Sequence, residues 1–252
     1  METHLFRCLS DNYGVLVHDP DSGETASIDV PEEAAVRKAL ADTGWTLTHI
    51  FITHHHADHI GGLAALKGPD VTVIGPRKDE ARIPGLDILV HEGDSVVFGG
   101  ERVMVFETPG HTSGHVTYWM PESGLVFAGD TLFAMGCGRL FEGTPADMWA
   151  SLSKIAALPP QTKVFCGHEY TLSNARFAAT ADPTNAALKA RLAEVEKKTA
   201  AGIPTVPTTV GEELATNPFA RANTPEVAAA MGMPGASPEK VLAEVRARKD
   251  SF

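Results

Sequence analysis

Apolar residues in the first 168 positions fall into short runs separated by glycine, proline and polar residues. Runs of this kind, with alternating or continuous apolar character, predict strands rather than long helices. The predicted strands are residues 13–18, 25–29, 47–53, 71–74, 87–90, 95–98, 102–107, 116–120, 125–128 and 163–166. We expect residues 163–166 to form the last strand of the chain.

Helical spacing of apolar residues interrupts these strands. Residues 31–43 and 145–158 are predicted helices, and Thr144 is placed to cap the second one with its hydroxyl. Residues 59–66 are also predicted to be helical, although Gly61 and Gly62 lower helix stability. We interpret these two glycines as positions where the backbone passes close to a site formed by the neighbouring histidines.

The pattern changes after residue 168. Ala-rich, charged segments at helical spacing predict helices over residues 171–180, 186–199, 225–231 and 238–249, with a Pro/Thr-rich linker at 203–209. Strands followed by helices are typical of the α+β class. We therefore expect a catalytic domain over residues 1–168 and a helical C-terminal domain over residues 169–252.

Composition and charge narrow the function classes. A chain of 252 residues with 43% apolar content can bury a large core. The formal net charge of -11 disfavours nucleic acid as a partner, because no basic stripe is available to neutralise phosphates. The N-terminus has no signal pattern, and no apolar run approaches the roughly 18 residues that a membrane span needs. We expect a soluble cytoplasmic protein that has no membrane contact.

The cysteines predict no disulfide framework. Cys8, Cys137 and Cys166 are an odd number and have no CxxC spacing. Cys166 lies in an apolar run and is interpreted as a small buried residue. Cys137 lies between two glycines, which favours a small residue in a tight loop over a nucleophile.

Candidate metal ligands stand directly after predicted strands. They are His54, His56, Asp58, His59, His111, Asp130 and His168. Loops beyond the carboxyl ends of strands gather at one edge of an α/β sheet, so we expect these side chains to meet there. Imidazole and carboxylate ligands in this number are enough for two divalent ions with room left for water.

Spacing suggests how the ligands are shared, because side chains two residues apart on an extended loop project to the same side. The first ion is assigned His54, His56 and His111, the second is assigned Asp58, His59 and His168, and Asp130 bridges them. Two ions roughly 3.5–4 Å apart can hold a shared hydroxide, because bound water has a pKa lowered toward about 7. Such a hydroxide attacks a carbonyl at neutral pH, and Asp58 can accept its proton.

Three neighbours of the ligands have other predicted roles. Asp29 either orients a ligating histidine or is a turn residue before Pro31, and both interpretations remain open. His55 is expected to face away from its neighbours. His115 is expected to be a hydrogen-bonding residue near the site.

Motifs around these residues carry a resemblance to a known family. They are His54-x-His56-x-Asp58-His59, Thr108-Pro109-Gly110-His111-Thr112, Gly129-Asp130-Thr131-Leu132-Phe133, Gly136-Cys137-Gly138-Arg139-Leu140-Phe141-Glu142-Gly143-Thr144, Gly167-His168-Glu169-Tyr170-Thr171 and Arg246-Ala247-Arg248-Lys249-Asp250. The first is the signature of the metallo-β-lactamase superfamily. The set as a whole, which spans essentially the entire chain, resembles glyoxalase II, the hydroxyacylglutathione hydrolase family.

The resemblance implies a four-layer αββα sandwich with metals at one edge of its two sheets and a C-terminal helical domain that binds substrate. It implies hydrolysis of the thioester S-D-lactoylglutathione to D-lactate and glutathione by a hydroxide that bridges two metals, a step of methylglyoxal detoxification. The ligand set suits zinc first, with iron or manganese as alternatives. We expect a monomer.

The resemblance also assigns glutathione contacts to Arg139, Phe141, Tyr170, Arg246 and Lys249. Glutathione carries two carboxylates, and arginine and lysine are their natural partners. Phe141 stands where some members of the family have a tyrosine, which removes one hydroxyl contact. Residues 29–31 contain one more residue than in relatives, with no expected effect on the ligands.

Other functions remain open at this stage. A lactonase, a β-lactamase or a generic thioesterase would use the same fold. A mononuclear-iron persulfide dioxygenase would need only one His-rich site, and the intact Asp58, His59 and His168 set argues against it. A non-catalytic metal- or glutathione-binding protein is the alternative from another class.

Overall fold

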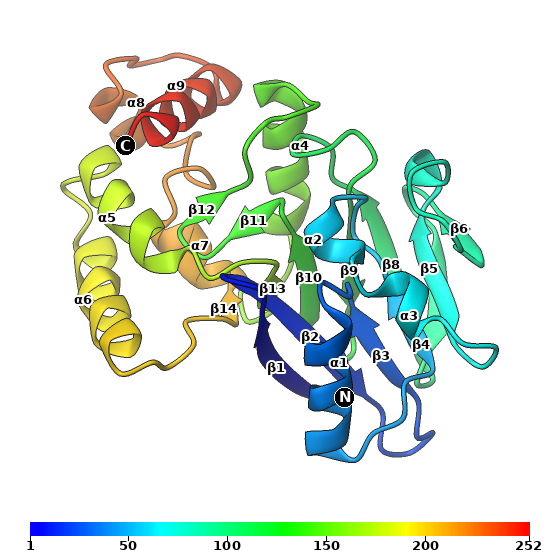
Figure 1. Ribbon diagram of the computed structural model, residues 1–252. Helices are drawn as coiled ribbons and strands as arrows, with labels where there is room; N and C mark the ends of the chain where they lie inside the picture. Colours follow the sequence, from blue (N-terminus) through cyan, green and yellow to red (C-terminus); the bar gives the residue numbers. More distant parts are fainter. The chain divides into compact units, whose positions relative to one another are not determined.

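The short apolar runs form strands throughout the first half of the computed structural model, which describes all 252 residues (Figure 1). Contacts between residues divide the chain into two compact units. Unit 1 consists of Met1–Glu107 and Ser113–Gly129, and unit 2 consists of Thr108–Thr112 and Asp130–Phe252. The mixture of sheets and separate helices confirms the predicted α+β class.

The first sheet of unit 1 has the strand order β1-β2-β3-β4-β5-β6. Its strands are β1 (Glu2–Cys8), β2 (Asn12–His18), β3 (Thr25–Ile28), β4 (His49–Phe51), β5 (Thr72–Pro76) and β6 (Ile88–Val90). The pairs from β1 to β3 are antiparallel, whereas those from β3 to β6 are parallel. Because β3 and β4 run in parallel, the residues that follow both strands emerge at the same edge, and these residues include Asp29 and His54.

The second sheet of unit 1 packs face to face on the first. Its strands β7 (Ser95–Phe98), β8 (Glu101–Glu107), β9 (Val116–Met120) and β10 (Leu125–Gly129) are antiparallel neighbours. The ring of Phe51 in β4 lies 5.1 Å from that of Tyr118 in β9 and 5.9 Å from that of Phe98 in β7. The Tyr118 hydroxyl donates to the Ile52 carbonyl at 2.7 Å, which satisfies the one polar atom of this buried side chain.

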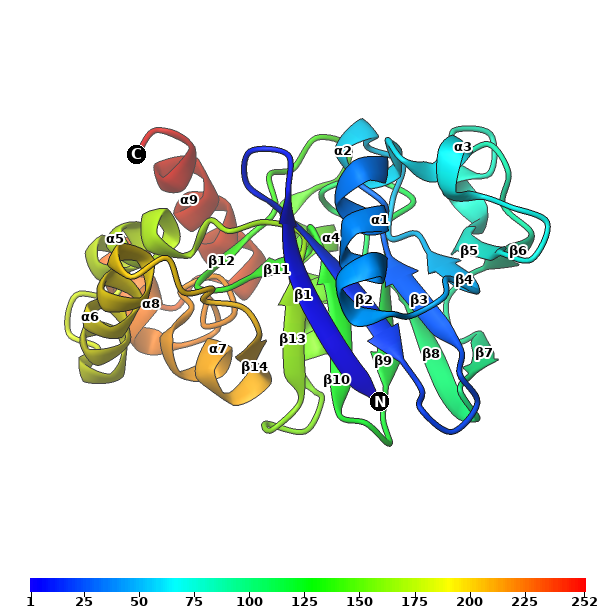
Figure 2. The same ribbon diagram turned by 60° about the horizontal axis from the view of Figure 1, so that its bottom comes forward.

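Helix α1 (Glu33–Thr43) covers the outer face of the first sheet, where Figure 2 shows it in front of β2 and beside β1. Its Val36 and Ala39 are buried in one apolar cluster with Leu16 and Ile50 of the sheet. The helix begins at Glu33 rather than at Pro31, because Glu32 already has an extended backbone. Gly44, with a left-handed φ of 75°, ends the helix after Thr43 as a residue without Cβ can.

The segment predicted as one helix over residues 59–66 is two short helices, α2 (Ala57–Ile60) and α3 (Leu63–Leu66). Gly61 and Gly62 lie between them against the chain that follows β3. A Cβ at Gly61 would lie 2.7 Å from the Pro31 carbonyl oxygen, and one at Gly62 would lie 2.8 Å from the Glu33 nitrogen. Our interpretation that the glycines let the backbone pass a metal site was therefore wrong, since backbone approaches backbone here.

Unit 2 combines short strands with helices. Its strands are β11 (Leu132–Phe133), β12 (Gly136–Cys137), β13 (Lys163–Cys166) and β14 (Thr208–Thr209). Its helices are α4 (Pro145–Ala156), α5 (Thr171–Ala181), α6 (Ala186–Ala200), α7 (Val210–Thr216), α8 (Pro225–Ala230) and α9 (Pro238–Asp250). Thr144 caps α4 as predicted, through a capping box with Asp147.

Several short elements were missed. Strand β1 lacks regular alternation, and β11, β12 and β14 are pairs of residues that no periodicity reveals. Strand β14 pairs antiparallel with β13, so the prediction that residues 163–166 form the last strand was wrong. Helix α7 follows β14 directly and is capped by Thr209 with Glu212. No helix is long and apolar enough to cross a membrane.

Replacing Gly62 with alanine tests the close approach of the two backbones. The added Cβ meets the Glu33 nitrogen at 2.8 Å and the Val30 carbonyl oxygen at 3.1 Å, and neither atom can turn aside as a side chain can. We expect Gly62→Ala to lower the free energy of unfolding by about 1–3 kcal/mol, measured by urea denaturation. The control is Gly68→Ala, whose Cβ meets nothing within 4 Å. Equal stability of the two variants would contradict the packing described.

Candidate metal centre

The buried carboxylate of Asp29 organises the ligand segment of unit 1. Its Oδ1 accepts from the Thr53 backbone N–H at 2.7 Å, and its Oδ2 accepts from the Thr53 hydroxyl at 2.8 Å. Oδ2 also lies 2.8 Å from Nδ1 of His59. Asp29 therefore orients a candidate ligand, which is one of the two interpretations left open by the sequence. Its left-handed backbone, with φ of 55°, turns the chain at the end of β3.

These hydrogen bonds determine which nitrogen of two histidines carries the proton. Nδ1 of His59 donates to the Asp29 carboxylate, so the Nε2 lone pair of the neutral ring is left for a metal. The Thr53 hydroxyl donates its one hydrogen to Asp29. It is therefore an acceptor toward Nδ1 of His54, which lies at 3.0 Å. Nε2 of His54 is thereby the nitrogen without a hydrogen in its neutral ring as well.

Rings of the predicted histidine ligands gather within unit 1. The ring centroid of His54 lies 4.1 Å from that of His59 and 4.7 Å from that of His56. His115 stacks on His54 at 4.9 Å, which places this fully buried residue beside the ligands as predicted. His55 turns to Asp79, with 3.0 Å between Nδ1 and Oδ2. It lies away from His54, at 6.5 Å between ring centroids, but its ring stays 5.0 Å from that of His56.

Asn12 is a site neighbour that the sequence did not reveal. Its side-chain amide donates to Oδ2 of Asp58 at 3.0 Å and to the Asp58 carbonyl at 3.2 Å. The same Oδ2 of Asp58 lies 3.7 Å from Nε2 of His59. Because Asn12 precedes Asp58 by 46 positions, no local spacing could connect the two residues.

Unit 2 brings its three predicted ligands together. Oδ2 of Asp130 lies 3.3 Å from Nε2 of His111 and 3.3 Å from Nε2 of His168. All three side chains are buried. Nδ1 of His111 donates to the Arg139 carbonyl at 2.9 Å, so Nε2 is again the nitrogen without a hydrogen in the neutral ring.

This geometry fits divalent metal ions. Two imidazole nitrogens face one carboxylate oxygen, and lone pairs that face each other at 3.3 Å repel unless a cation lies nearby. A proton or a metal ion satisfies this need, and mixed imidazole and carboxylate donors are the usual ligands of zinc, iron and manganese. The residues present therefore suit divalent ions.

Four of the five predicted glutathione contacts lie at or near the surface of unit 2. Phe141 is 62% exposed and its ring lies 5.2 Å from that of His111. Tyr170 stacks on His168, with 4.7 Å between ring centroids and 4° between planes. Arg139 is exposed and its Nε lies 3.9 Å from the Asp250 carboxylate. Two predicted contacts thus touch predicted metal ligands directly.

Helix α9 carries the basic pair. Arg246 is only 7% exposed and donates to the Cys137 carbonyl at 3.0 Å and to Asp250 at 2.9 Å. Lys249 donates to Oγ of Ser173 at 2.9 Å. Partial burial, and then the charges of Arg246 and Arg139, lower the pKa of Lys249 from its ordinary value. These cations therefore crowd one another, which favours an anionic ligand.

All three cysteines are buried free thiols. Burial raises the pKa of Cys137 to about 11 and that of both Cys8 and Cys166 to about 12. A thiol with such a pKa is protonated at neutral pH and is a poor nucleophile. The interpretation of Cys166 as a small buried residue is confirmed, and the geometry agrees with the same view of Cys137.

Comparison with known proteins identifies the class of this site. The model of the metallo-beta-lactamase superfamily matches residues 21–168, and that of the hydroxyacylglutathione hydrolase C-terminus matches residues 169–252. Among solved structures, ETHE1 from Myxococcus xanthus superposes with a TM-score of 0.68 at 27% identity, covering 100% of this chain and 99% of that one. The fold and the ligands define a metal-dependent enzyme of the metallo-β-lactamase superfamily, which confirms the predicted fold.

Full-length relatives identify the family within this class. The chain is 56% identical to a hydroxyacylglutathione hydrolase of Rhizobium meliloti (strain 1021), covering 100% of this chain and 99% of the relative. It is 54% identical to a hydroxyacylglutathione hydrolase of Maricaulis maris (strain MCS10), with 98% and 97% covered. The chain belongs to the hydroxyacylglutathione hydrolase family, as the sequence motifs predicted.

Replacing Asp29 with asparagine tests its control of the ligands. Asparagine keeps the shape and tolerates the left-handed backbone, but its amide lacks the charge and presents a donor where Asp29 only accepts. We expect metal affinity to fall about 10- to 100-fold, measured by competition with a chromogenic chelator. Asp19→Asn, which changes a carboxylate bonded to the Ser22 N–H, is the control. Unchanged affinity in Asp29→Asn would refute this role.

Proposed function

We propose that this chain hydrolyses the thioester S-D-lactoylglutathione to D-lactate and glutathione at two divalent metal ions. Membership of the hydroxyacylglutathione hydrolase family gives the substrate class, a glutathione thioester. The observation that carries the mechanism is the Asp130 carboxylate oxygen that faces Nε2 of both His111 and His168. Such an oxygen is suited to a bridging role between two ions.

The proposed ligands follow the assignment made from sequence spacing. Three sets of side chains could each hold an ion: His54, His56 and His111; Asp58, His59 and His168; and His54, His59 and Asp130. The first two sets support one ion each, and the third supports Asp130 as the bridge. A further structural relative, TTHA1623, was solved in a di-iron-bound form, with a TM-score of 0.62 at 25% identity, covering 87% of this chain and 100% of that one. We propose two ions, with zinc as the metal.

Two bound ions would supply a hydroxide at neutral pH, because they lower the pKa of water, and they would polarise the thioester carbonyl. The protein's own part is to hold the ligands still and to handle the proton. Asp58 is proposed to accept the proton of the attacking water. The Asn12 amide, which donates to Oδ2 of Asp58 at 3.0 Å, fixes the direction in which this carboxylate points.

The leaving group explains why few further catalytic groups are needed. A thiol with a pKa near 8.5 leaves readily as a thiolate, so the reaction does not require a dedicated general acid. The residues around the ligands agree, because Asn12 and Thr53 are neutral groups that orient their neighbours and are not acids. The buried thiols contribute no nucleophile of their own.

The glutathione moiety is proposed to bind beside α5 and α9 of unit 2. Arg139, Arg246 and Lys249 provide positive charge for its carboxylates, while Phe141 and Tyr170 provide aromatic surface. A cavity of about 400 Å³ lined by Tyr170, Ser173 and Phe252 lies next to Lys249, whose ammonium group is bonded to Ser173. This volume is in the range of small-molecule sites.

The proposal also assigns a separate role to each of two domains. We propose that residues 1–168 form the catalytic domain and residues 169–252 the substrate-binding domain of a monomer. The family models for residues 21–168 and 169–252 support a boundary at this point. Under this division, Arg139 and Phe141 are glutathione contacts that the catalytic domain supplies.

Turnover of S-D-lactoylglutathione, with metal content measured on the same sample, tests the function. We expect rapid hydrolysis with close to two ions per chain. In Asp130→Ala we expect both the hydrolysis and the binding of two ions to be lost. A lactone, a β-lactam and a thioester without glutathione serve as comparison substrates. Absence of hydrolysis with both ions bound, or a faster reaction with a comparison substrate, would refute the proposed substrate.

Replacing Lys249 with methionine tests the glutathione site. The substitution keeps the length of the side chain and removes a charge that contacts a non-reacting part of the substrate. We therefore expect KM to rise about tenfold or more, while kcat changes less than about twofold. Lys240→Met, at an exposed position of the same helix, should leave both constants unchanged. An unaltered KM in Lys249→Met would contradict the assignment.

A further inference from the structure

The hairpin of residues 130–139, which contains β11 and β12, contacts two of the proposed metal ligands, Asp130 at its start and His111 at its end. Asp130 begins it, and Arg139 ends it with the carbonyl that accepts from Nδ1 of His111 at 2.9 Å. The two ends touch, because a Cβ at Gly138 would lie 2.0 Å from the Asp130 carbonyl oxygen. The path of this hairpin therefore determines where Asp130 and His111 lie relative to each other.

The hairpin has little regular structure to hold its shape. Its ladder consists of two residue pairs, Leu132 with Cys137 and Phe133 with Gly136. At its tip Met135 has a left-handed backbone with φ of 59°, an uncommon conformation for a residue with a long side chain. Such a conformation persists only where the surroundings impose it.

The side chains of Glu213, in α7, and Asn217, just after it, are buried and hold the backbone around Met135 in this conformation. The Asn217 amide donates to the Gly136 carbonyl at 2.9 Å and to the Phe133 carbonyl at 3.3 Å. Oε2 of Glu213 accepts from the Met135 N–H at 2.8 Å. The backbone groups of three residues at the tip of the hairpin are thus paired with two side chains from another part of the chain.

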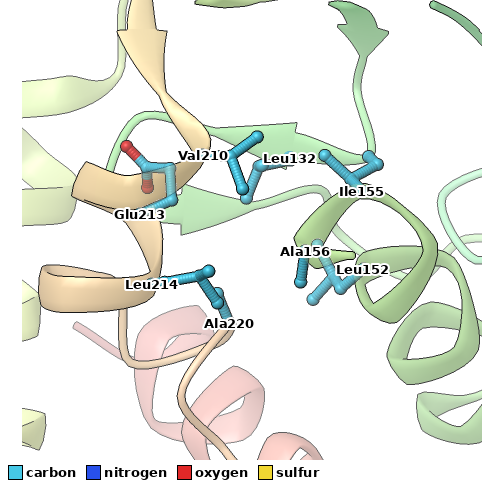
Figure 3. Close-up of a pocket in the computed structure, with 8 residues that line it drawn as sticks. All are labelled: Leu132, Leu152, Ile155, Ala156, Val210, Glu213, Leu214 and Ala220. Atoms are coloured by element: carbon cyan, nitrogen blue, oxygen red, sulfur yellow. The ribbon is translucent and has the colours of Figure 1, made fainter. Parts of the chain in front are cut away.

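The pair is itself held in place by other contacts. Glu213 accepts from the Asn217 amide at 2.8 Å, and its other oxygen accepts from Arg191 at 2.6 Å. Oδ1 of Asn217 accepts from the Phe219 N–H at 2.9 Å. Figure 3 shows Glu213 on α7 with its carboxyl group turned away from the apolar side chains of Leu152 and Ile155 in α4. These contacts hold the side chains of Glu213 and Asn217 in one position, so they bind the tip of the hairpin in one conformation.

We propose that Glu213 and Asn217 are positioning residues of the metal centre, acting through the 130–139 hairpin on Asp130 and His111. Their role is indirect. Glu213 and Asn217 hold the backbone at the tip of the hairpin, and the tip in turn fixes the contact between Gly138 and Asp130. The Arg139 carbonyl, at the end of the hairpin, then orients the His111 ring. This proposal rests on the metal ligands of the proposed function and extends it to α7, which none of the sequence motifs includes.

Asn217→Ala is the test, because alanine removes both bonds to the hairpin while sparing the buried ion pair of Glu213 with Arg191. We expect zinc to leave the variant about 10- to 100-fold faster than the wild type when a chelator is added. We also expect kcat to fall by more than KM rises, because the substrate contacts are largely kept. Asn185→Ala is the matched control, since Asn185 caps α6 and bonds Asp182 and Ala215 but not the hairpin.

The outcomes separate this proposal from the function on which it rests. A wild type that binds no zinc and hydrolyses no thioester refutes the proposed function. A wild type that does both, with equal zinc release from Asn217→Ala and Asn185→Ala, overturns the positioning role alone. If Asn217→Ala does not fold, Asn174→Ala tests the route from the tip to the ligands, because its amide donates to the Ala134 carbonyl of the hairpin at 3.2 Å. Zinc release equal to that of Asn185→Ala would then overturn the proposal.

Discussion

Hydrogen bonding by the buried carboxylate of Asp29 is the constraint on which the ligand segment depends. Asp29 holds the end of β4 against the end of β3 through Thr53, and it accepts from His59. Because the Thr53 hydroxyl donates its only hydrogen to Asp29, one carboxylate determines which ring nitrogen carries the hydrogen in both His54 and His59. Three donors share this acceptor, so the local backbone and the chemistry of the ligands are set by the same interaction.

The sequence revealed the candidate ligands because their signal is local. Each ligand follows an apolar run, and runs of this kind form strands whose ends carry functional residues. Asn12 and Asn217 could not be predicted in this way, because each acts on a segment far away in the chain. The misinterpretation of Gly61 and Gly62 has the same origin. Close approach was inferred correctly, but only the folded chain reveals that Pro31 and Glu33 are the neighbours.

Short elements escaped prediction for a different physical reason. Two-residue strands such as β11, β12 and β14 have no period to detect, and their backbone is held by side chains from elsewhere, as Asn217 holds Gly136. Helix α7 was overlooked because a Pro/Thr-rich stretch precedes it, although Thr209 and Glu212 form a capping box there. Strands β11 and β12 lie between Asp130 and Arg139, where tertiary contacts outweigh local preference.

The raised pKa values of the three cysteines have a consequence for an enzyme whose product is itself a thiol. Exchange between a protein thiol and glutathione disulfide begins with a thiolate, and its rate depends on access as well as on ionisation. Cys8, Cys137 and Cys166 are buried, and their pKa values of about 12, 11 and 12 keep them protonated. The protein is thereby resistant to forming mixed disulfides with the disulfide form of the thiol that it releases at every turnover.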